Sequence, residues 1–135
     1  MLPVRTAIAL GVAVGLLATG CSNQKASVNR RPHPGTVTAS VVDGVQQVTV
    51  SAGDTYRFDP SRIVVHPGRV RVVLRNDGKG APHNWTLADI AATPLTPSGK
   101  QSQIEFTAPS PGEYTYVCTI HAKQGQTGTL VVSAN

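Results

Sequence analysis

The sequence has few aromatic and few charged residues, and neither kind is concentrated in one segment. Aromatic residues make up 4% and charged residues 14% of the 135 residues. The formal net charge is +5, but the arginines between Arg69 and Arg75 alternate with apolar residues instead of forming a basic block. Because nucleic-acid binding requires a concentrated basic patch or a platform of stacking rings, this composition argues against it. The positive balance suits an acidic partner or a surface of anionic lipid.

Cysteine is also scarce, and the two cysteines lie in different surroundings. Cys21 stands at the head of a polar segment, whereas Cys118 ends an apolar one. Two cysteines in an exported protein would ordinarily suggest a disulfide. Their separate contexts make a disulfide the weaker interpretation and predict a separate role for each thiol.

A long apolar run is missing as well. The longest one, residues 7–17, follows Arg5 and is too short for a membrane-spanning helix, so residues 1–20 are predicted to be a secretory signal peptide. The sequence around Gly20-Cys21 resembles the lipidation signal of bacterial lipoproteins, although that signal usually has a large aliphatic residue where Ala18 stands. The resemblance implies that Cys21 is lipidated and becomes the new N-terminus. An ordinary signal peptide with a spare thiol is the alternative.

The length leaves room for one domain after this segment. Residues 21–35 are polar and are predicted to form a flexible tether that begins at the lipidated cysteine. Residues 36–135 are predicted to be the folded domain. The protein is therefore expected to be exported and to be a lipid-anchored monomer at the extracytoplasmic face of the bacterial cell membrane.

Helical periodicity is nearly absent from residues 36–135, where short alternating segments are separated by turn residues. For example, Val70, Val72 and Leu74 alternate with other residues before Asn76-Asp77-Gly78 ends the segment. Seven to eight such strands fit into this length, and their regular spacing predicts an all-β sandwich. Residues 87–92 could form one or two helical turns.

Four possible metal ligands lie in two segments of the domain. Cys118 and His121 are three residues apart, Gln126 follows them, and His83 lies upstream in the run Ala81-Pro82-His83-Asn84-Trp85. One thiolate, two imidazoles and a weaker donor are the set that a mononuclear blue copper site requires. A strand that ends at Cys118 can continue into a tight loop that returns His121 and Gln126 to one metal ion. Taken alone, however, Cys118 could be a small buried core residue.

The surrounding sequence makes this pattern specific. Residues 106–132 contain Pro111-Gly112-Glu113-Tyr114 before the cysteine, and the upstream half contains Phe58-x-Pro60, Pro67-Gly68 and Pro82-His83-Asn84. Residues 36–132 closely resemble the cupredoxins, the family of plastocyanin and azurin. The resemblance implies an eight-stranded Greek-key β-sandwich with one copper ion, either Cu(II) or Cu(I), near one end.

The resemblance also implies roles for individual residues. His83, Cys118 and His121 match the family's imidazole and thiolate ligands, and Asn84 matches an asparagine that braces the two ligand loops beside Thr119.

The axial position departs from the usual pattern of the family. Eight residues after the cysteine, where the family usually has methionine, stands Gln126, as in stellacyanin-type members. The resemblance therefore implies an axial amide oxygen, a harder donor that favours Cu(II) and lowers the reduction potential. Alternatively, Gln126 is a polar loop residue and Asn84 an ordinary turn residue.

Among functions, the resemblance favours transfer of single electrons to or from a redox partner protein. Copper storage, delivery or resistance in the envelope would use the same ligands, but methionine-rich and histidine-rich tracts are missing. An enzyme is not expected, because copper oxidases and nitrite reductases need further histidines and this chain has four. A binuclear copper centre would need a second cysteine in the metal loop.

Overall fold

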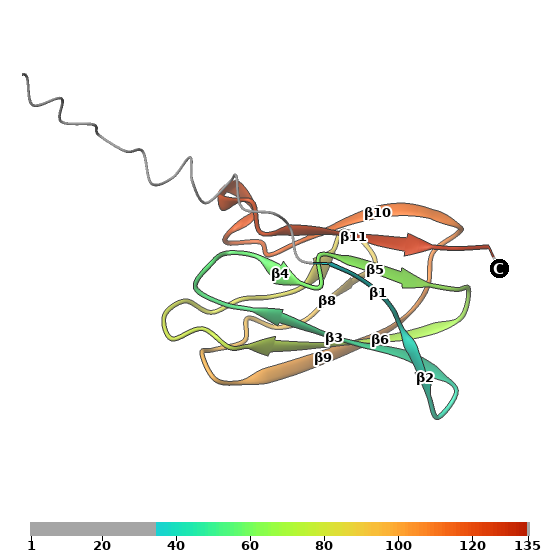
Figure 1. The fold of residues 1–135 in the computed structure, drawn as a ribbon, viewed down its shortest axis with the longest axis horizontal. Helices are drawn as coiled ribbons and strands as arrows, with labels where there is room; N and C mark the ends of the chain where they lie inside the picture. Colours follow the sequence, from blue (N-terminus) through green and yellow to red (C-terminus); the bar gives the residue numbers. More distant parts are fainter. Residues whose placement is uncertain (1–34, 135) are drawn as a thin grey trace, which may run out of the picture.

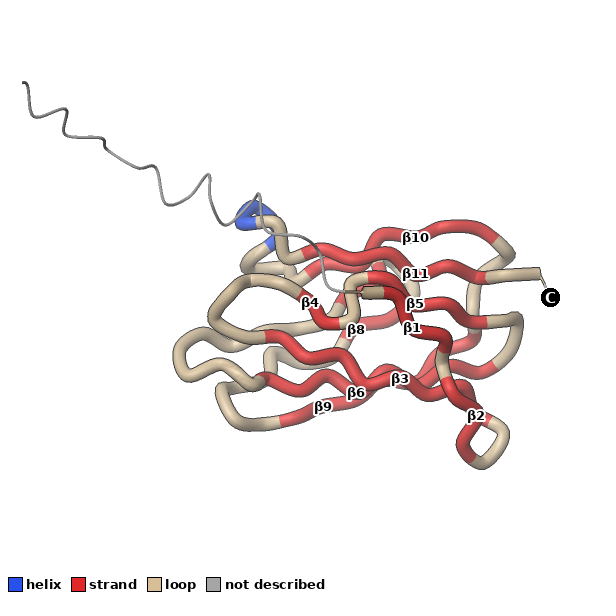
Figure 2. Tube along the Cα trace, in the orientation of Figure 1, coloured by secondary structure: helices blue, strands red, loops and turns tan. Residues whose placement is uncertain are grey.

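The computed structural model describes residues 35–134, which form two β-sheets packed face to face (Figure 1). The predicted signal peptide, Cys21 and nearly all of the predicted tether lie outside the described residues. The all-β class is confirmed (Figure 2). Eleven strands are present in this part of the chain rather than seven or eight, because several are only two or three residues long. No helix within residues 35–134 has the length and hydropathy needed to span a bilayer.

The first sheet has six strands in the order β1-β5-β11-β10-β7-β8. Strands β1, β5 and β11 are parallel to one another, and the remaining neighbours are antiparallel. Their bounds are β1 Thr36–Thr38, β5 Arg62–Val65, β7 Thr86–Leu87, β8 Ala91–Ala92, β10 Gly112–Val117 and β11 Thr127–Val132.

The second sheet has the order β2-β3-β6-β9, and the short strand β4 pairs with β3. Strands β3 and β6 are parallel, and the other pairs are antiparallel. The bounds are β2 Ser40–Val42, β3 Val45–Ala52, β4 Phe58–Asp59, β6 Arg69–Asn76 and β9 Gln101–Thr107. The chain crosses repeatedly between the sheets, so each layer contains strands that are distant in sequence.

Alternation along the strands places apolar side chains between the two sheets. In β6, Val70, Val72 and Leu74 are fully buried, whereas the alternate residues Arg69, Arg71, Val73 and Arg75 are exposed or half-buried. An aromatic cluster joins the layers: the Tyr116 ring lies 5.2 Å from the rings of both Phe58 and Trp85. Tyr116 lies on β10 two residues before Cys118, so the cluster adjoins the loop that carries three of the predicted ligands.

Residues 87–92 do not form helical turns. They are a hairpin in which β7 pairs with β8, and Asp89 at its turn has φ 60°. Leu87 is buried in the core, and Ala91 packs against that core. Packing of these two residues against the core from two paired strands therefore overrides a spacing that also suits one face of a helix.

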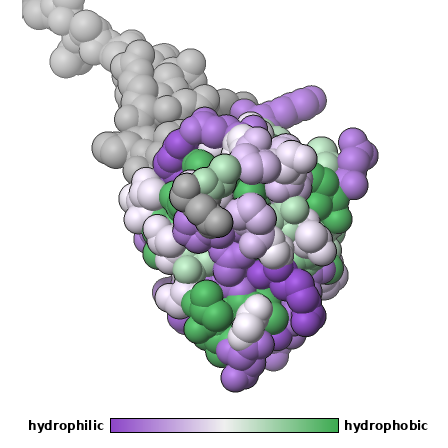
Figure 3. Space-filling view, turned by 90° about the vertical axis from the view of Figure 1, so that its right-hand side faces the viewer, coloured by the Kyte–Doolittle hydropathy of each residue, from purple (hydrophilic) through white to green (hydrophobic). Residues whose placement is uncertain are grey.

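The loops that carry the predicted metal ligands lie at one end of the sandwich, on the left in Figure 1. There β3 and β6 end, and the short 3₁₀ turn η1 (Ala122–Gln124) connects β10 towards β11. Figure 3 shows the opposite end, where apolar and polar surface alternate.

Candidate metal centre

The loop from β10 to β11 is closed by its own backbone. The amide of Cys118 donates to the carbonyl of Gln126 (3.0 Å), and the amide of Gln126 donates to the carbonyl of His121 (3.2 Å). Gly125 follows η1 with φ 89°, a left-handed conformation that glycine adopts without steric cost. These bonds gather Cys118, His121 and Gln126 into one short loop.

His83 reaches the same place from the segment between β6 and β7. Its amide donates to the carbonyl of Thr96 (3.1 Å), and its carbonyl accepts from the amide of Thr96 (2.7 Å). Both backbone groups of His83 are thus fixed by one residue of the opposing segment. The side chain is fully buried.

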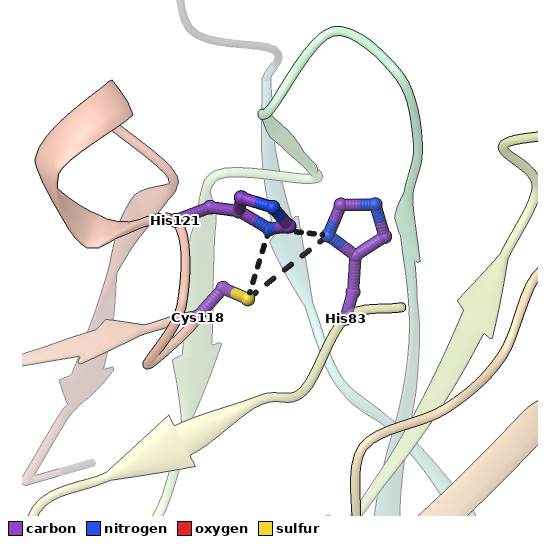
Figure 4. A group of neighbouring side chains, drawn as sticks. All are labelled: His83, Cys118 and His121. Carbon is purple, nitrogen blue, oxygen red and sulfur yellow. Dashed lines mark hydrogen bonds between the residues drawn. The ribbon is translucent and has the colours of Figure 1, made fainter. Parts of the chain in front are cut away.

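The three predicted principal ligands converge (Figure 4). His83 Nδ1 and His121 Nδ1 are 3.2 Å apart, and Cys118 Sγ lies 4.0 Å and 3.5 Å from them respectively. A point equidistant from the three atoms in their plane would lie about 2.1 Å from each, which is the length of a metal–nitrogen bond and within about 0.2 Å of a metal–sulfur bond. The donors therefore fit one ion in trigonal coordination. Within residues 35–134, Cys118 forms no disulfide.

Gln126 lies beside this plane and is completely buried. Its Oε1 is 2.9 Å from His83 Nδ1, the same nitrogen that faces Cys118 Sγ. Its amide Nε2 has no hydrogen-bond partner among the described residues. The carbonyl end of the side chain thus points into the donor group, as an axial amide ligand requires. Gln124, the other glutamine of the loop, is exposed.

Burial sets the protonation of the first histidine. Desolvation lowers the pKa of His83, and the neighbouring His121 lowers it further. The hydrogen bond with Gln126 and the charge of Asp54 act in the opposite direction but do not reverse the shift. His83 is therefore held in the neutral form that a metal ligand must have.

Asn84 connects the two ligand-bearing segments. Its Oδ1 accepts hydrogen bonds from the amide (2.9 Å) and the hydroxyl (3.2 Å) of Thr119. Its Nδ2 lies 3.0 Å from the same hydroxyl oxygen. The residue after His83 is thus tied to the residue after Cys118, which is the contact expected of a brace.

Sequence reasoning missed a third segment at this end, residues 53–57. The Tyr56 ring lies 4.5 Å from the His121 ring, and the Arg57 guanidinium contacts the loop before Gln126. No sequence motif pointed to these residues, because their partners lie far along the chain.

His66 lies outside the donor group. It is an exposed residue directly after β5, and its ring nitrogen Nδ1 lies 3.3 Å from the carbonyl oxygen of Ser133.

The donor set has the composition of a copper site rather than of a closed zinc site. Two imidazoles and one thiolate, with a weak fourth donor, are typical of blue copper, whereas structural zinc takes four strong ligands in a tetrahedron. The buried Gln126 amide is a weak donor of the kind that such copper sites accept at their axial position.

Solved structures with a similar fold include several copper proteins. Reduced auracyanin from Roseiflexus castenholzii has a TM-score of 0.61 at 23% identity, covering 64% of this chain and 96% of that one. Auracyanin A, a blue copper protein of Chloroflexus aurantiacus, has 0.59 at 25% identity, covering 73% and 100%. The metal-binding domain of the Cu(I)-exporting P-type ATPase CopA of Streptococcus pneumoniae has 0.54 at 18% identity, covering 76% and 99%.

A search of curated proteins found no match to this sequence. The family model of the cupredoxin-like domain, however, matches residues 11–132. Together with the similarity to the blue copper protein auracyanin A and the His83, Cys118 and His121 group, this match identifies the cofactor as one copper ion. The chain belongs to the family of cupredoxin-like domains.

Proposed function

We propose that this protein carries single electrons as a type 1 (blue) copper protein. The observation that carries the proposal is the buried convergence of His83, Cys118 and His121 on one point. Bound copper supplies a one-electron couple, Cu(II)/Cu(I). The ligand atoms are already close together, and Asn84 ties their loops, so they need to move little when the charge of the site changes. A small rearrangement favours fast electron exchange.

His121 is the proposed route for the electron. It is the most exposed of the three ligands, at 8%, and its neighbour Ile120 is 46% exposed. Pro82, beside His83, is also exposed, so each ligand histidine has an exposed apolar neighbour in the sequence. Such surface can approach a redox partner protein closely and exclude water from the contact.

Gln126 is the proposed axial ligand. An amide oxygen is a harder donor than the thioether of methionine, so it stabilises Cu(II) relative to Cu(I). The protein is therefore expected to have a low reduction potential for its family. The support is the position of Oε1 beside His83 Nδ1.

We also propose that the domain works as a monomer at the outer face of the membrane, held by a lipid on Cys21. The support is the sequence before residue 36, which has the order of signal, cysteine and polar tether. Expression of the full chain and of Cys21→Ser, followed by fractionation and mass spectrometry, tests it. Lipid mass on Cys21 and release of the variant from membranes are expected, whereas membrane association of both without lipid contradicts the anchor.

An optical and electron paramagnetic resonance (EPR) spectrum of the copper-loaded domain tests the electron-carrier proposal. Intense blue absorption is expected with Cu(II), because a thiolate in the trigonal plane donates charge to the ion. Cys118→Ser should abolish the colour. A correctly folded, copper-loaded protein without the blue band would sink the proposal.

Copper storage, delivery or resistance is the second candidate. The observation in its favour is the likeness to the metal-binding domain of a Cu(I)-exporting ATPase, which shows that this fold also occurs in a copper exporter. Measuring electron self-exchange beside the rate of copper release separates the two. Fast exchange with slow release supports the carrier, and slow exchange with easy release supports delivery.

We propose no enzymatic activity. Within residues 35–134, the one histidine outside the copper site is His66, which lies at the end of β5 and is bonded to Ser133. A second copper centre built from histidines is therefore not supported. Turnover of nitrite or phenolic donors by the copper-loaded protein would contradict this part of the proposal.

A further inference from the structure

Residues 53–57 connect β3 to β4 and supply none of the proposed ligands, yet they contact both ligand loops. The amide of Tyr56 donates to the carbonyl of Gly53 (3.0 Å), so the segment is closed as a turn. Tyr56 has φ 52°, a left-handed conformation that residues other than glycine seldom adopt. Strained backbone of this kind persists where the surrounding contacts hold it, and it is often found at functional sites.

The first contact is made by Arg57 with the loop between His121 and Gln126. The Arg57 side chain is buried, at 5% exposure. Its Nη1 donates to the carbonyl of Gly125 (2.8 Å) and lies 3.4 Å from the carbonyl of Gln124. Gly125 immediately precedes Gln126, so the guanidinium fixes the peptide unit from which the proposed axial ligand extends.

The second contact is made by Asp54 with the segment before His83. Its carboxylate accepts hydrogen bonds from the amide of Lys79 (3.1 and 3.0 Å) and from the amide of Gly80 (3.2 Å). The two loops approach so closely that a Cβ added to Gly78 would lie 2.7 Å from Asp54 Oδ1. The segment that leads to His83 is thus held by a charged acceptor.

The third contact is made by Tyr56 with the histidine rings. Its ring centroid lies 4.5 Å from that of His121, with 34° between the planes. It lies 6.3 Å from that of His83 in an edge-on arrangement. The half-buried tyrosine therefore covers His121 and restricts rotation of its ring.

We propose that residues 53–57 are a positioning element of the copper site. Arg57 positions Gln126, Asp54 positions His83, and Tyr56 positions the His121 ring. This element is separate from the tie between Asn84 and Thr119, which joins the residues that directly follow His83 and Cys118. The inference concerns the copper site itself and stands whether the bound copper carries electrons or is delivered.

The charge of Arg57 adds an effect that simple packing would not have. A guanidinium remains protonated at physiological pH. A buried positive charge beside the ligand loop disfavours the more highly charged Cu(II), so it raises the reduction potential. Asp54 is exposed, and solvent screens its charge, so its replacement should change the potential less.

Arg57→Gln and Arg57→Lys test the role of the guanidinium, with Arg62→Gln as the matched control. Arg62 forms an exposed ion pair with Glu113, and none of its hydrogen bonds within residues 35–134 reaches a ligand loop. We expect Arg57→Gln to weaken copper affinity about 10- to 100-fold, as loss of a ligand-supporting group typically does. It should also change the EPR spectrum and lower the potential. Arg57→Lys should restore the potential but not the spectrum, because the lysine nitrogen is one bond closer to the backbone than Arg57 Nη1 and does not reach the two carbonyls in the same geometry.

Asp54→Ala and Asp54→Asn test the other half of the element. Asp54 is exposed, so both variants should fold even if the Arg57 variants do not. Asp54→Ala should weaken copper affinity, and Asp54→Asn, which keeps one acceptor, should recover part of the loss. Amide hydrogen exchange of Lys79 and Gly80 in the metal-free protein should accelerate in Asp54→Ala. This exchange measurement tests the positioning role of Asp54 even if the wild-type protein does not carry electrons.

Several results would overturn the inference. One is an Arg57→Gln protein with lowered thermal stability but the affinity, spectrum and potential of the wild type. Another is an Asp54→Ala protein with unchanged copper affinity and unchanged exchange at Lys79. Equal effects of Arg62→Gln and Arg57→Gln on the affinity and the potential would likewise overturn it. They would show that the net charge of the protein, and not the contact of Arg57 with the ligand loop, sets these properties.

Discussion

At the scale of single residues, the site brings several buried polar side chains together, and some of their polar atoms lack hydrogen-bond partners. His83, Cys118 and Gln126 are all fully buried, and two of their polar atoms, His83 Nε2 and Gln126 Nε2, have no hydrogen-bond partner in the described part of the chain. Buried polar groups without partners destabilise a fold. The other polar atoms of the same side chains, His83 Nδ1 and Gln126 Oε1, face the donor group, so the placement of the donors leaves two buried nitrogens without partners.

Gln126→Met is expected to raise the reduction potential. A thioether is a softer donor than an amide oxygen and stabilises Cu(I), and the two side chains have similar length. Electrochemistry of the copper-loaded variant measures the change. Gln124→Met is the matched control, because Gln124 is an exposed glutamine of the same loop. Equal potentials in the wild type and Gln126→Met would mean that the amide does not contact the ion.

Gly128→Ala is expected to destabilise the fold. A Cβ at Gly128 would lie 2.2 Å from the Tyr116 ring, which is itself held between Phe58 and Trp85. Forcing atoms into a packed core costs about 1–3 kcal/mol in unfolding free energy. Urea denaturation of the metal-free protein measures this loss. Gly35→Ala, whose Cβ meets nothing within 4 Å, should be close to neutral, and a neutral Gly128→Ala would show that the ring can move aside.

At the scale of elements, the strands were predictable and the long-range contacts were not. The alternation of β6 is local, so the buried positions Val70, Val72 and Leu74 follow from the sequence. The convergence of His83, Cys118 and His121 was expected from resemblance to a family, since their separation of up to 38 residues has no local signature. Arg57 was missed because its acceptors lie 67 and 68 residues away.

Asn84→Ala is expected to loosen the connection between the two ligand-bearing segments. It removes every hydrogen bond between the side chain and Thr119, and each lost bond of this kind typically costs about 0.5–1.5 kcal/mol. A double-mutant cycle with Thr119→Val in the metal-free protein should give a coupling energy of about 0.5–3 kcal/mol. The cycle isolates the bonds to the Thr119 hydroxyl, because the backbone amide of residue 119 still donates to Asn84 in Thr119→Val. Additive effects of the two changes would show that the hydroxyl bonds do not stabilise the pair.

At the scale of the whole molecule, the copper site occupies one end of a core that does not depend on it. The buried residues of both sheets extend from Val132, at the end of β11, to Cys118 at the metal loop. Most of the buried core residues, including Ile63, Val65 and Leu130, lie on strands, whereas the proposed ligands lie in loops. The fold should therefore form without metal, unlike small domains whose folding requires an ion.

Removal of copper is accordingly expected to lower the stability of the domain without unfolding it. A ligand that binds only the folded state stabilises it by about 4 kcal/mol at a thousandfold excess over its dissociation constant. Calorimetry should show a cooperative transition for the metal-free protein and a higher Tm after copper is added. Cys118→Ser removes the thiolate, so copper should raise its Tm much less. A metal-free protein without a cooperative transition would mean that the ion, and not the core between the two sheets, holds the sandwich together.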